Sequence, residues 1–172
     1  MIKIREEFIQ EALSYAEESC RYTSNRHDFH DGKLADKKQK MYEGKLGEKI
    51  FKEFLIKQNV IFLEDNSPAN EADLYDFLIH NLRVDVKTRT KPFHTRTLEM
   101  VEQMQRDPKD IYVSIKLDSN KQSGSIIGWA TSEDFINHNR IQNNGYLDNY
   151  VLYDNELRTL KELIDLFNHL QS

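Results

Sequence analysis

The stretch DLYDFLIHNLRVDVKT, residues 73–88, constrains the fold more than any other part of the chain. Two short segments rich in apolar residues flank His80 and Asn81, where the pattern indicates a tight turn. We therefore predict a β-hairpin closed by a two-residue turn. In that register Asp76 lies directly opposite Asp85, with both side chains on one face of the hairpin.

This predicted pair of carboxylates suggests a chemical site. Like charges that face each other cost stability unless something compensates them, and a divalent cation would do so. Lys87 follows Asp85 by two residues and shares its face of the strand. Two carboxylates and a lysine suit metal-assisted phosphodiester hydrolysis, in which Lys87 would orient water or stabilise charge at phosphorus. The alternative is a solvated strand face on which Asp85 and Lys87 merely pair.

Asp73 is a second candidate for the first carboxylate. With a two-residue turn, Asp73 falls opposite Thr88 and on the wrong face of the hairpin. A longer turn or a β-bulge would reverse that choice. The sequence favours Asp76 and leaves Asp73 open.

The segment GKLGEKIFKEFLIKQ, residues 44–58, predicts an amphipathic helix. Its apolar residues form one arc at helical spacing: Leu46, Ile50, Phe51, Phe54 and Leu55. Glu48 lies on the rim of that arc, so it would be a third carboxylate that reaches the metal directly or through water. A carboxylate favoured near a helix start is the simpler interpretation. Gly44 and Gly47 would let another part of the backbone approach closely.

The other segments complete an α+β or mixed α/β pattern of helices, then strands, then helices. We expect helices over 3–21, 34–43 and 156–170, a helix start with Thr131 as N-cap, and strands over 60–65, 111–117 and 126–131. Residues 91–110 read as a connector with one or two helical turns, and 143–149 as a loop. The polar stretch 23–33 also reads as a loop, whose histidines and aspartates lack the apolar framework of a metal site.

Composition narrows the class of protein. The 172 residues fit one domain, 38% are hydrophobic and 31% are charged, which allows a real core in a soluble chain. A single cysteine excludes an internal disulfide. No apolar run approaches the roughly 18 residues that span a bilayer. We expect a cytoplasmic protein with no membrane partner.

The net charge of −5 argues against general nucleic-acid binding, but the charge is uneven. From Arg83 to Arg96 there are five basic residues and one acid. Four residues follow the predicted site directly and are the candidates for phosphate contacts: Arg89, Lys91, His94 and Arg96. An ordinary solvated loop explains them almost as well.

Several segments resemble the PD-(D/E)XK nuclease superfamily, which includes restriction enzymes and junction resolvases. They are GKLGEKIFKEFL, DLYDFLIHNLRVDVKTRT, YVSIKL and IIGWATSEDF, in the order that the superfamily shows. Its pattern is a helix Glu, an Asp on one strand and (D/E)-x-K on the next, which Glu48, Asp76 and Asp85-Val86-Lys87 match. The chain departs from the name-giving motif because Tyr75, not proline, precedes Asp76.

The resemblance covers about residues 44–135 and implies a restriction endonuclease-like core, with a mixed central β-sheet flanked by helices. The whole chain, 1–172, would be one nuclease-like domain, with a helical extension over 1–43 and a helical region over 136–172. The resemblance also implies Mg²⁺, which Mn²⁺ can replace, held by Glu48, Asp76, Asp85 and the Val86 carbonyl.

These residues together predict a metal-dependent endonuclease that cuts nucleic acid, with DNA as the expected substrate. A homodimer or a partner protein would extend its footprint on the nucleic acid. The alternative from another functional class is a non-catalytic nucleic-acid-binding or protein-interaction module with the same fold.

Overall fold

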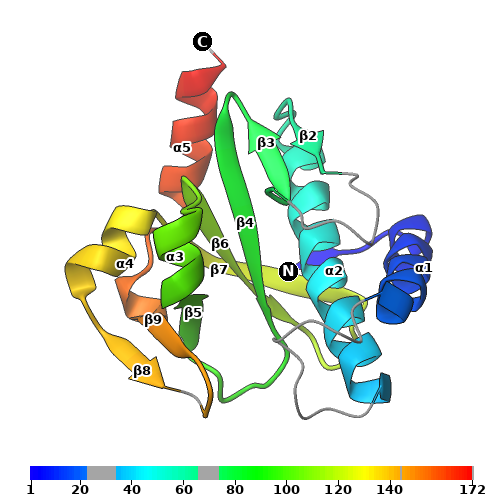
Figure 1. Ribbon diagram of the computed structural model, residues 1–172. Coiled ribbons are helices and arrows are strands. Elements are labelled where there is room, and N and C mark those ends of the chain that lie inside the picture. The colour runs from blue at the N-terminus through cyan, green and yellow to red at the C-terminus, as the bar shows by residue number, and fades with distance from the viewer. Residues whose placement is uncertain (23–33, 66–73, 144, 172) are drawn as a thin grey trace.

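The computed structural model describes residues 1–22, 34–65, 74–143 and 145–171, which form a mixed α+β fold (Figure 1). Asp73 and the polar stretch 23–33 lie outside the described residues. The elements in chain order are β1 (Ile2–Lys3), α1 (Glu6–Tyr22), α2 (Leu34–Lys57), β2 (Leu63–Glu64), β3 (Phe77–Ile79), β4 (Leu82–Arg89), β5 (Arg96–Met100), α3 (Val101–Arg106), β6 (Ile111–Leu117), β7 (Ser123–Ala130), α4 (Ser132–His138), β8 (Ile141–Asn143), β9 (Asp148–Tyr153), a 3₁₀ turn (Asp154–Glu156) and α5 (Leu160–Leu170).

The central sheet is curled and mixed, with the six strands in the order β1-β7-β6-β4-β3-β2. Strands β4 and β6 are parallel, and the other neighbouring pairs are antiparallel. A smaller antiparallel sheet has the order β5-β9-β8. In Figure 1, α1 and α2 lie on one side of β4, whereas α3, α4 and the smaller sheet lie on the other. The predicted mixed central sheet flanked by helices is therefore confirmed.

Two apolar clusters hold these layers together. The larger one joins the apolar arc of α2 to the central sheet, and its members include Leu46, Ile50, Phe51, Val84 and Val113. The smaller one lies on the other side, where Tyr112 meets Phe135 edge to face with ring centroids 5.3 Å apart. Helix α2 packs against β4, whose Val84 is buried in the larger cluster, while most other residues of the strand are half-buried.

Helix α2 runs without a break through the point where the sequence suggested two helices. Gly47 stands where α2 crosses β4, and a Cβ atom there would lie 1.9 Å from Thr88 Oγ1. The Thr88 hydroxyl also donates to the carbonyl of Gly44 at 3.3 Å. The expected close approach of a second segment is thus confirmed at Gly47, where it fixes α2 against the strand that carries Asp85, whereas a Cβ atom at Gly44 would meet nothing within 4 Å.

Four strands were missed by the sequence reading: β1, which includes Lys3 where a helix was expected to begin, and three strands further along the chain. Strand β5 lies in the expected connector, and β8 and β9 lie in the region over 136–172 that was expected to be helical. The inward-facing residues of β5 are Thr97 and Glu99, both buried and both polar, so the strand shows no apolar alternation. Its pairing with β9, about 50 residues away, decides its structure.

Other local predictions were confirmed closely. Strand β6 has the predicted bounds, and Thr131 caps α4 through a capping box with Asp134. Helix α5 begins later than expected, after a second capping box formed by Thr159 and Glu162. Within the described ranges no helix is long and apolar enough to cross a membrane.

Candidate active site

The β3–β4 hairpin has the predicted turn and register. His80 and Asn81 both have positive φ values, 47° and 69°, as a two-residue hairpin turn of the favoured type requires. Phe77 pairs with Val84 in the ladder. The N–H of Asp76, however, donates to the carbonyl of that same Val84 at 2.9 Å. The register therefore changes at Asp76, and the predicted direct pairing of Asp76 with Asp85 is not part of the ladder.

Asp76 reaches β4 with its side chain instead of its backbone. Its Oδ2 accepts a hydrogen bond of 2.6 Å from the N–H of Val86. Burial raises the pKa of Asp76 well above its ordinary value, and the negative charges of Glu48 and Asp85 raise it further. The Val86 N–H and Lys45 oppose this rise without cancelling it. The three predicted carboxylates thus act on one another electrostatically.

Asp85 and Lys87 share a face of β4, as predicted. Lys87 Nζ lies 2.8 Å from Asp85 Oδ2 and 2.5 Å from Glu99 Oε2. Burial alone would lower the pKa of Lys87, but the charges of Asp85 and Glu99 outweigh it and raise the pKa. Lys87 is therefore held as a cation between two carboxylates.

Glu99 is the site residue that the sequence reading missed. It lies on β5, its residue is only 2% exposed, and it contacts Lys87 across the space between the two sheets. Burial raises the pKa of Glu99, the charge of Lys87 opposes this, and the charge of Asp85 adds to it. A glutamate in a short, unrecognised strand gave no signal, because its role depends on the packing of β5 beside β4.

Glu48 lies on α2 with its side chain 12% exposed. Its Oε2 is 2.6 Å from Nζ of Lys45, one helical turn earlier. Burial lowers the pKa of Lys45, but the charge of Glu48 and their hydrogen bond outweigh it and raise that pKa. Glu48 is thus paired with a cation of its own, and its charge raises the pKa of Asp76.

The donor set fits a hard divalent cation by its chemistry. The charges of Glu48 and Asp85 act on Asp76 here, and the buried Asp85 Oδ2 has Lys87 Nζ at 2.8 Å as its neighbour. As the side chains stand, no three His, Cys, Asp or Glu residues in the described ranges lie close enough together to hold a metal ion. Lys45 and Lys87 instead neutralise Glu48 and Asp85. Metal binding would require these ion pairs to loosen.

The four candidates for phosphate contacts have different surroundings. Arg89 is 7% exposed and forms two hydrogen bonds to Asp154, of 2.6 and 2.8 Å, so its guanidinium is engaged inside the protein. Lys91, His94 and Arg96 are exposed. Arg96 donates a hydrogen bond to the side-chain oxygen of Gln142. The three exposed residues stay available for a partner, whereas Arg89 ties β4 to the 3₁₀ turn that follows β9.

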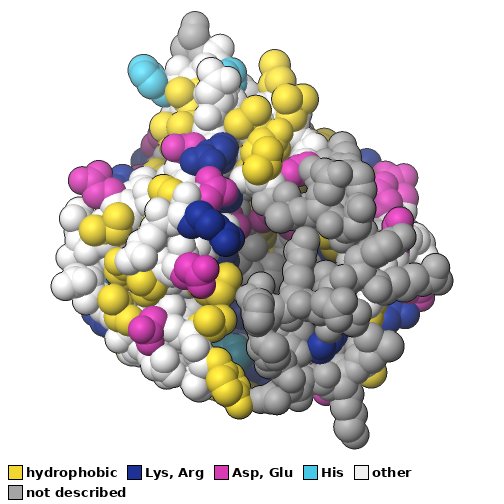
Figure 2. Space-filling view, in the orientation of Figure 1, with side chains coloured by type: hydrophobic (Ala, Val, Ile, Leu, Met, Phe, Trp, Pro, Cys, Tyr) yellow, Lys and Arg dark blue, Asp and Glu magenta, His cyan; other side chains and the backbone are white. Residues whose placement is uncertain are grey.

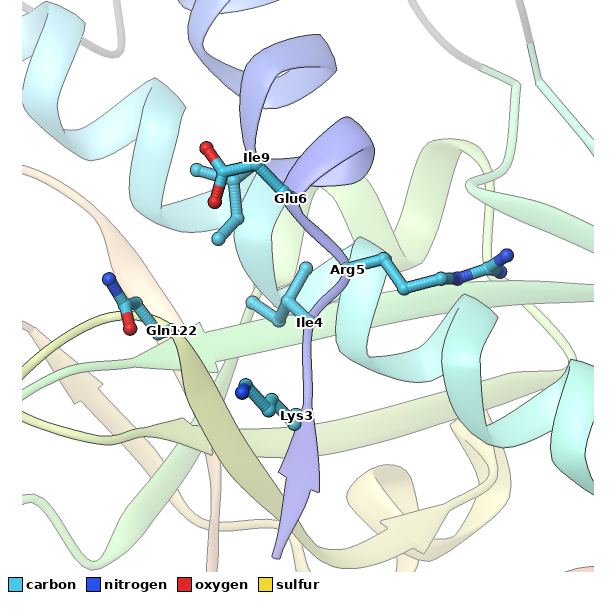
Figure 3. A pocket seen from close by; sticks show the side chains of 6 residues that line it. All are labelled: Lys3, Ile4, Arg5, Glu6, Ile9 and Gln122. Atoms are coloured by element: carbon cyan, nitrogen blue, oxygen red, sulfur yellow. The ribbon is translucent and has the colours of Figure 1, made fainter.

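Two other features stand out on the described part of the surface. On the face shown in Figure 2, Lys and Arg side chains alternate with Asp and Glu side chains along the middle, over α3. An open pocket at the start of α1 is lined by Lys3, Ile4, Arg5, Glu6, Ile9 and Gln122 (Figure 3). Arg5 in that pocket is already hydrogen-bonded to Glu53 at 2.7 Å. Neither feature brings reactive groups together as the β4 site does.

No protein-family model matches this chain, and no curated protein matches it.

Proposed function

We propose that this chain is a metal-dependent endonuclease that hydrolyses phosphodiester bonds of nucleic acid, with DNA as the expected substrate. One observation carries the proposal. Asp76 accepts from the N–H of Val86 at 2.6 Å, between Asp85 and Lys87 on β4, and the charges of Glu48 and Asp85 raise its pKa. Like charges gathered around a buried carboxyl favour a bound cation.

The proposed cation is Mg²⁺, or Mn²⁺ in its place. Glu48, Asp76, Asp85 and the Val86 carbonyl would hold it, because hard cations take oxygen ligands. When bound, such an ion polarises a phosphate oxygen and lowers the pKa of a water molecule.

The chain's own residues would supply orientation and charge. The N–H of Val86 holds the Asp76 carboxylate toward β4. Lys87 would donate hydrogen bonds to a phosphate oxygen and stabilise the negative charge that develops there. Its raised pKa suits this cationic role better than the role of a general base. Glu99 contacts no substrate in this proposal and acts by fixing the position of Lys87.

A second function is favoured by a specific observation. Lys45 and Lys87 already neutralise two of the three acids, so the cluster can persist without a metal ion. This supports a non-catalytic nucleic-acid-binding or protein-interaction module with the same fold. The two functions differ in whether metal ions bind at the site.

The test incubates the purified protein with single-stranded DNA, duplex DNA and RNA in Mg²⁺, Mn²⁺ or EDTA. The Asp85→Asn variant is compared with Asp165→Asn, which changes an exposed acid on α5. We expect metal-dependent cleavage by the wild type and by Asp165→Asn, and none by Asp85→Asn. Folded Asp85→Asn that cleaves at the wild-type rate would refute the nuclease proposal. Absence of both cleavage and metal binding would favour the second function.

A further inference from the structure

The loop between β4 and β5 carries an exposed aromatic side chain among basic residues. Phe93 is 76% exposed, and its ring meets the His94 ring edge to face, with centroids 4.8 Å apart. Lys91 and Arg96 flank this pair in the sequence and are exposed as well. Lys116 joins them from β6, because its Nζ lies 3.3 Å from the carbonyl of Pro92. We refer to Lys91, Phe93, His94, Arg96 and Lys116 as the loop surface.

The positive charge of the loop surface is not compensated. Ion pairs with acids engage most basic residues elsewhere in the described structure: Arg5, Lys38, Lys45, Lys49, Lys52, Arg83, Lys87, Arg89, Lys109, Lys121, Arg140 and Arg158. Within the same described ranges, Lys91, Arg96 and Lys116 take part in no ion pair; Arg96 and Lys116 instead donate to uncharged oxygens. In a chain of net charge −5, such a concentration of cations favours a polyanionic partner.

The position of the loop surface connects it with the candidate active site. Strand β4 carries Lys87 and leads directly into the loop, and six residues span at most about 20 Å. Lys116 is the register partner of Arg89 on the parallel neighbour strand, so the loop emerges beside β6. Nucleotides that flank a phosphate bound at Lys87 would therefore pass along this surface.

An exposed phenylalanine among uncompensated cations suits a partner that offers both an apolar face and negative charge. Stacking on an unpaired base supplies one, and it combines with phosphate contacts in proteins that bind single strands. In a duplex the bases are stacked on each other, so the ring would reach a base face only by unstacking a step, which costs a few kcal/mol.

We propose that the loop surface binds a single-stranded polynucleotide, with Phe93 stacked on a base and Lys91, Arg96 and Lys116 at phosphates. The inference rests on the proposed function, which it deepens by naming substrates with unpaired bases.

The test separates stacking from charge. Fluorescence anisotropy in EDTA, which prevents cleavage, measures binding of labelled oligothymidylate and of an abasic oligonucleotide with the same number of phosphates. We expect the wild type to bind oligothymidylate about ten-fold more tightly, as one to two stacked bases would give. Phe93→Ala should remove this preference, Phe93→Leu should remove it too, and Phe93→Tyr should keep it. Oligouridylate in a parallel arm distinguishes RNA from DNA.

The charge arm uses the Lys91→Ala, Lys116→Ala double variant. This variant should weaken binding of both oligonucleotides equally. The slope of the logarithm of the binding constant against the logarithm of salt concentration should become shallower by about 0.7 per lost phosphate contact. Ile136→Ala, at an exposed apolar residue on α4, serves as the control and should bind as the wild type does.

Several results would overturn the inference. The first is that the wild type binds the two oligonucleotides equally well. The second is that Phe93→Ala keeps the wild-type preference for oligothymidylate. The third is that Phe93→Ala has a different molar mass in solution from the wild type, which would show that Phe93 serves self-association. Failure of the proposed function can be distinguished from failure of this inference. If the preference for oligothymidylate depends on Phe93 but no substrate is cleaved, the loop surface is supported and the nuclease proposal is refuted. If the protein cleaves nucleic acid but its preference for oligothymidylate does not depend on Phe93, the nuclease proposal is supported and the loop-surface proposal is refuted.

Discussion

Lys87 and Arg89 are two residues apart on the same face of β4, yet their surroundings differ. Arg89 meets one acid, Asp154, through two hydrogen bonds that balance the charges. Lys87 meets two acids, Asp85 and Glu99, and a third carboxyl at Asp76 feels the charge of Asp85. A balanced pair holds two elements together, whereas a surplus of buried negative charge can recruit a cation. The comparison separates a structural contact from a candidate site on one strand.

The largest expected effect is on catalysis by Lys87. The Lys87→Met, Glu99→Gln double variant removes the cation together with Glu99, the more deeply buried of its two acid partners. Asp85 is 23% exposed and keeps some contact with water, so the variant should fold. We expect cleavage to fall about 100- to 1,000-fold, the usual cost of removing one group that stabilises the transition state. Initial cleavage rates measure this, with circular dichroism to verify folding. A folded double variant that cleaves at the wild-type rate would show that Lys87 has only a structural role, like that of Arg89.

The second prediction tests the surplus of acid directly. If a cation binds at Asp76 and Asp85, Mg²⁺ at about 100 times its Kd should stabilise the wild type by about 2.7 kcal/mol. For a domain of this size the melting temperature would rise by about 5–10 °C. Asp85→Asn should lose this rise, and Asp154→Asn, at the balanced pair, should keep it. Equal rises in both variants would place the metal elsewhere.

The third prediction concerns the balanced pair. Arg89→Ala leaves Asp154 without its guanidinium, and Asp154 keeps some contact with water because its side chain is 34% exposed. We expect a loss of about 2 kcal/mol in the free energy of unfolding, typical of losing hydrogen bonds to a charged group. Urea denaturation measures it, with Lys161→Ala on the exposed face of α5 as the control. An unchanged free energy would show that the pair adds nothing to stability.

The smallest expected effect is the dependence of stability on pH. Because the pKa of Asp76 is raised in the folded state, that state retains a proton which the unfolded state has already released. Stability therefore falls as pH rises from the ordinary carboxyl value of about 3.9 through the raised pKa. Asp76→Asn, whose amide oxygen still accepts from Val86, removes this loss.

The variant should then be more stable than the wild type at pH 8 in EDTA, and the difference should disappear near pH 4. Denaturation across that range, with Asp165→Asn beside it, checks the sign. A variant less stable at pH 8 would mean that the charged form of Asp76 is favoured in the fold.

The sequence by itself determined the local geometry of the site. The two-residue turn fixed the register of β4 against β3, and alternation put Asp85 and Lys87 on one face. The apolar arc of α2 set Glu48 on its rim, and the spacing of Thr131 and Asp134 predicted a helix start. Such features follow from strand and helix periods and from caps, which depend only on neighbouring residues.

The tertiary structure decided which distant residues meet on β4. Glu99 becomes a partner of Lys87 only because β5 pairs with β9, which no local pattern in that polar strand predicts. Arg89 finds Asp154, 65 residues away, and so leaves the set of phosphate candidates. Asp76 leaves the ladder because its side chain takes the Val86 N–H. Each outcome depends on long-range packing. Buried charges and backbone groups need partners, and these partners come from parts of the chain that are distant in sequence, so local patterns do not predict them.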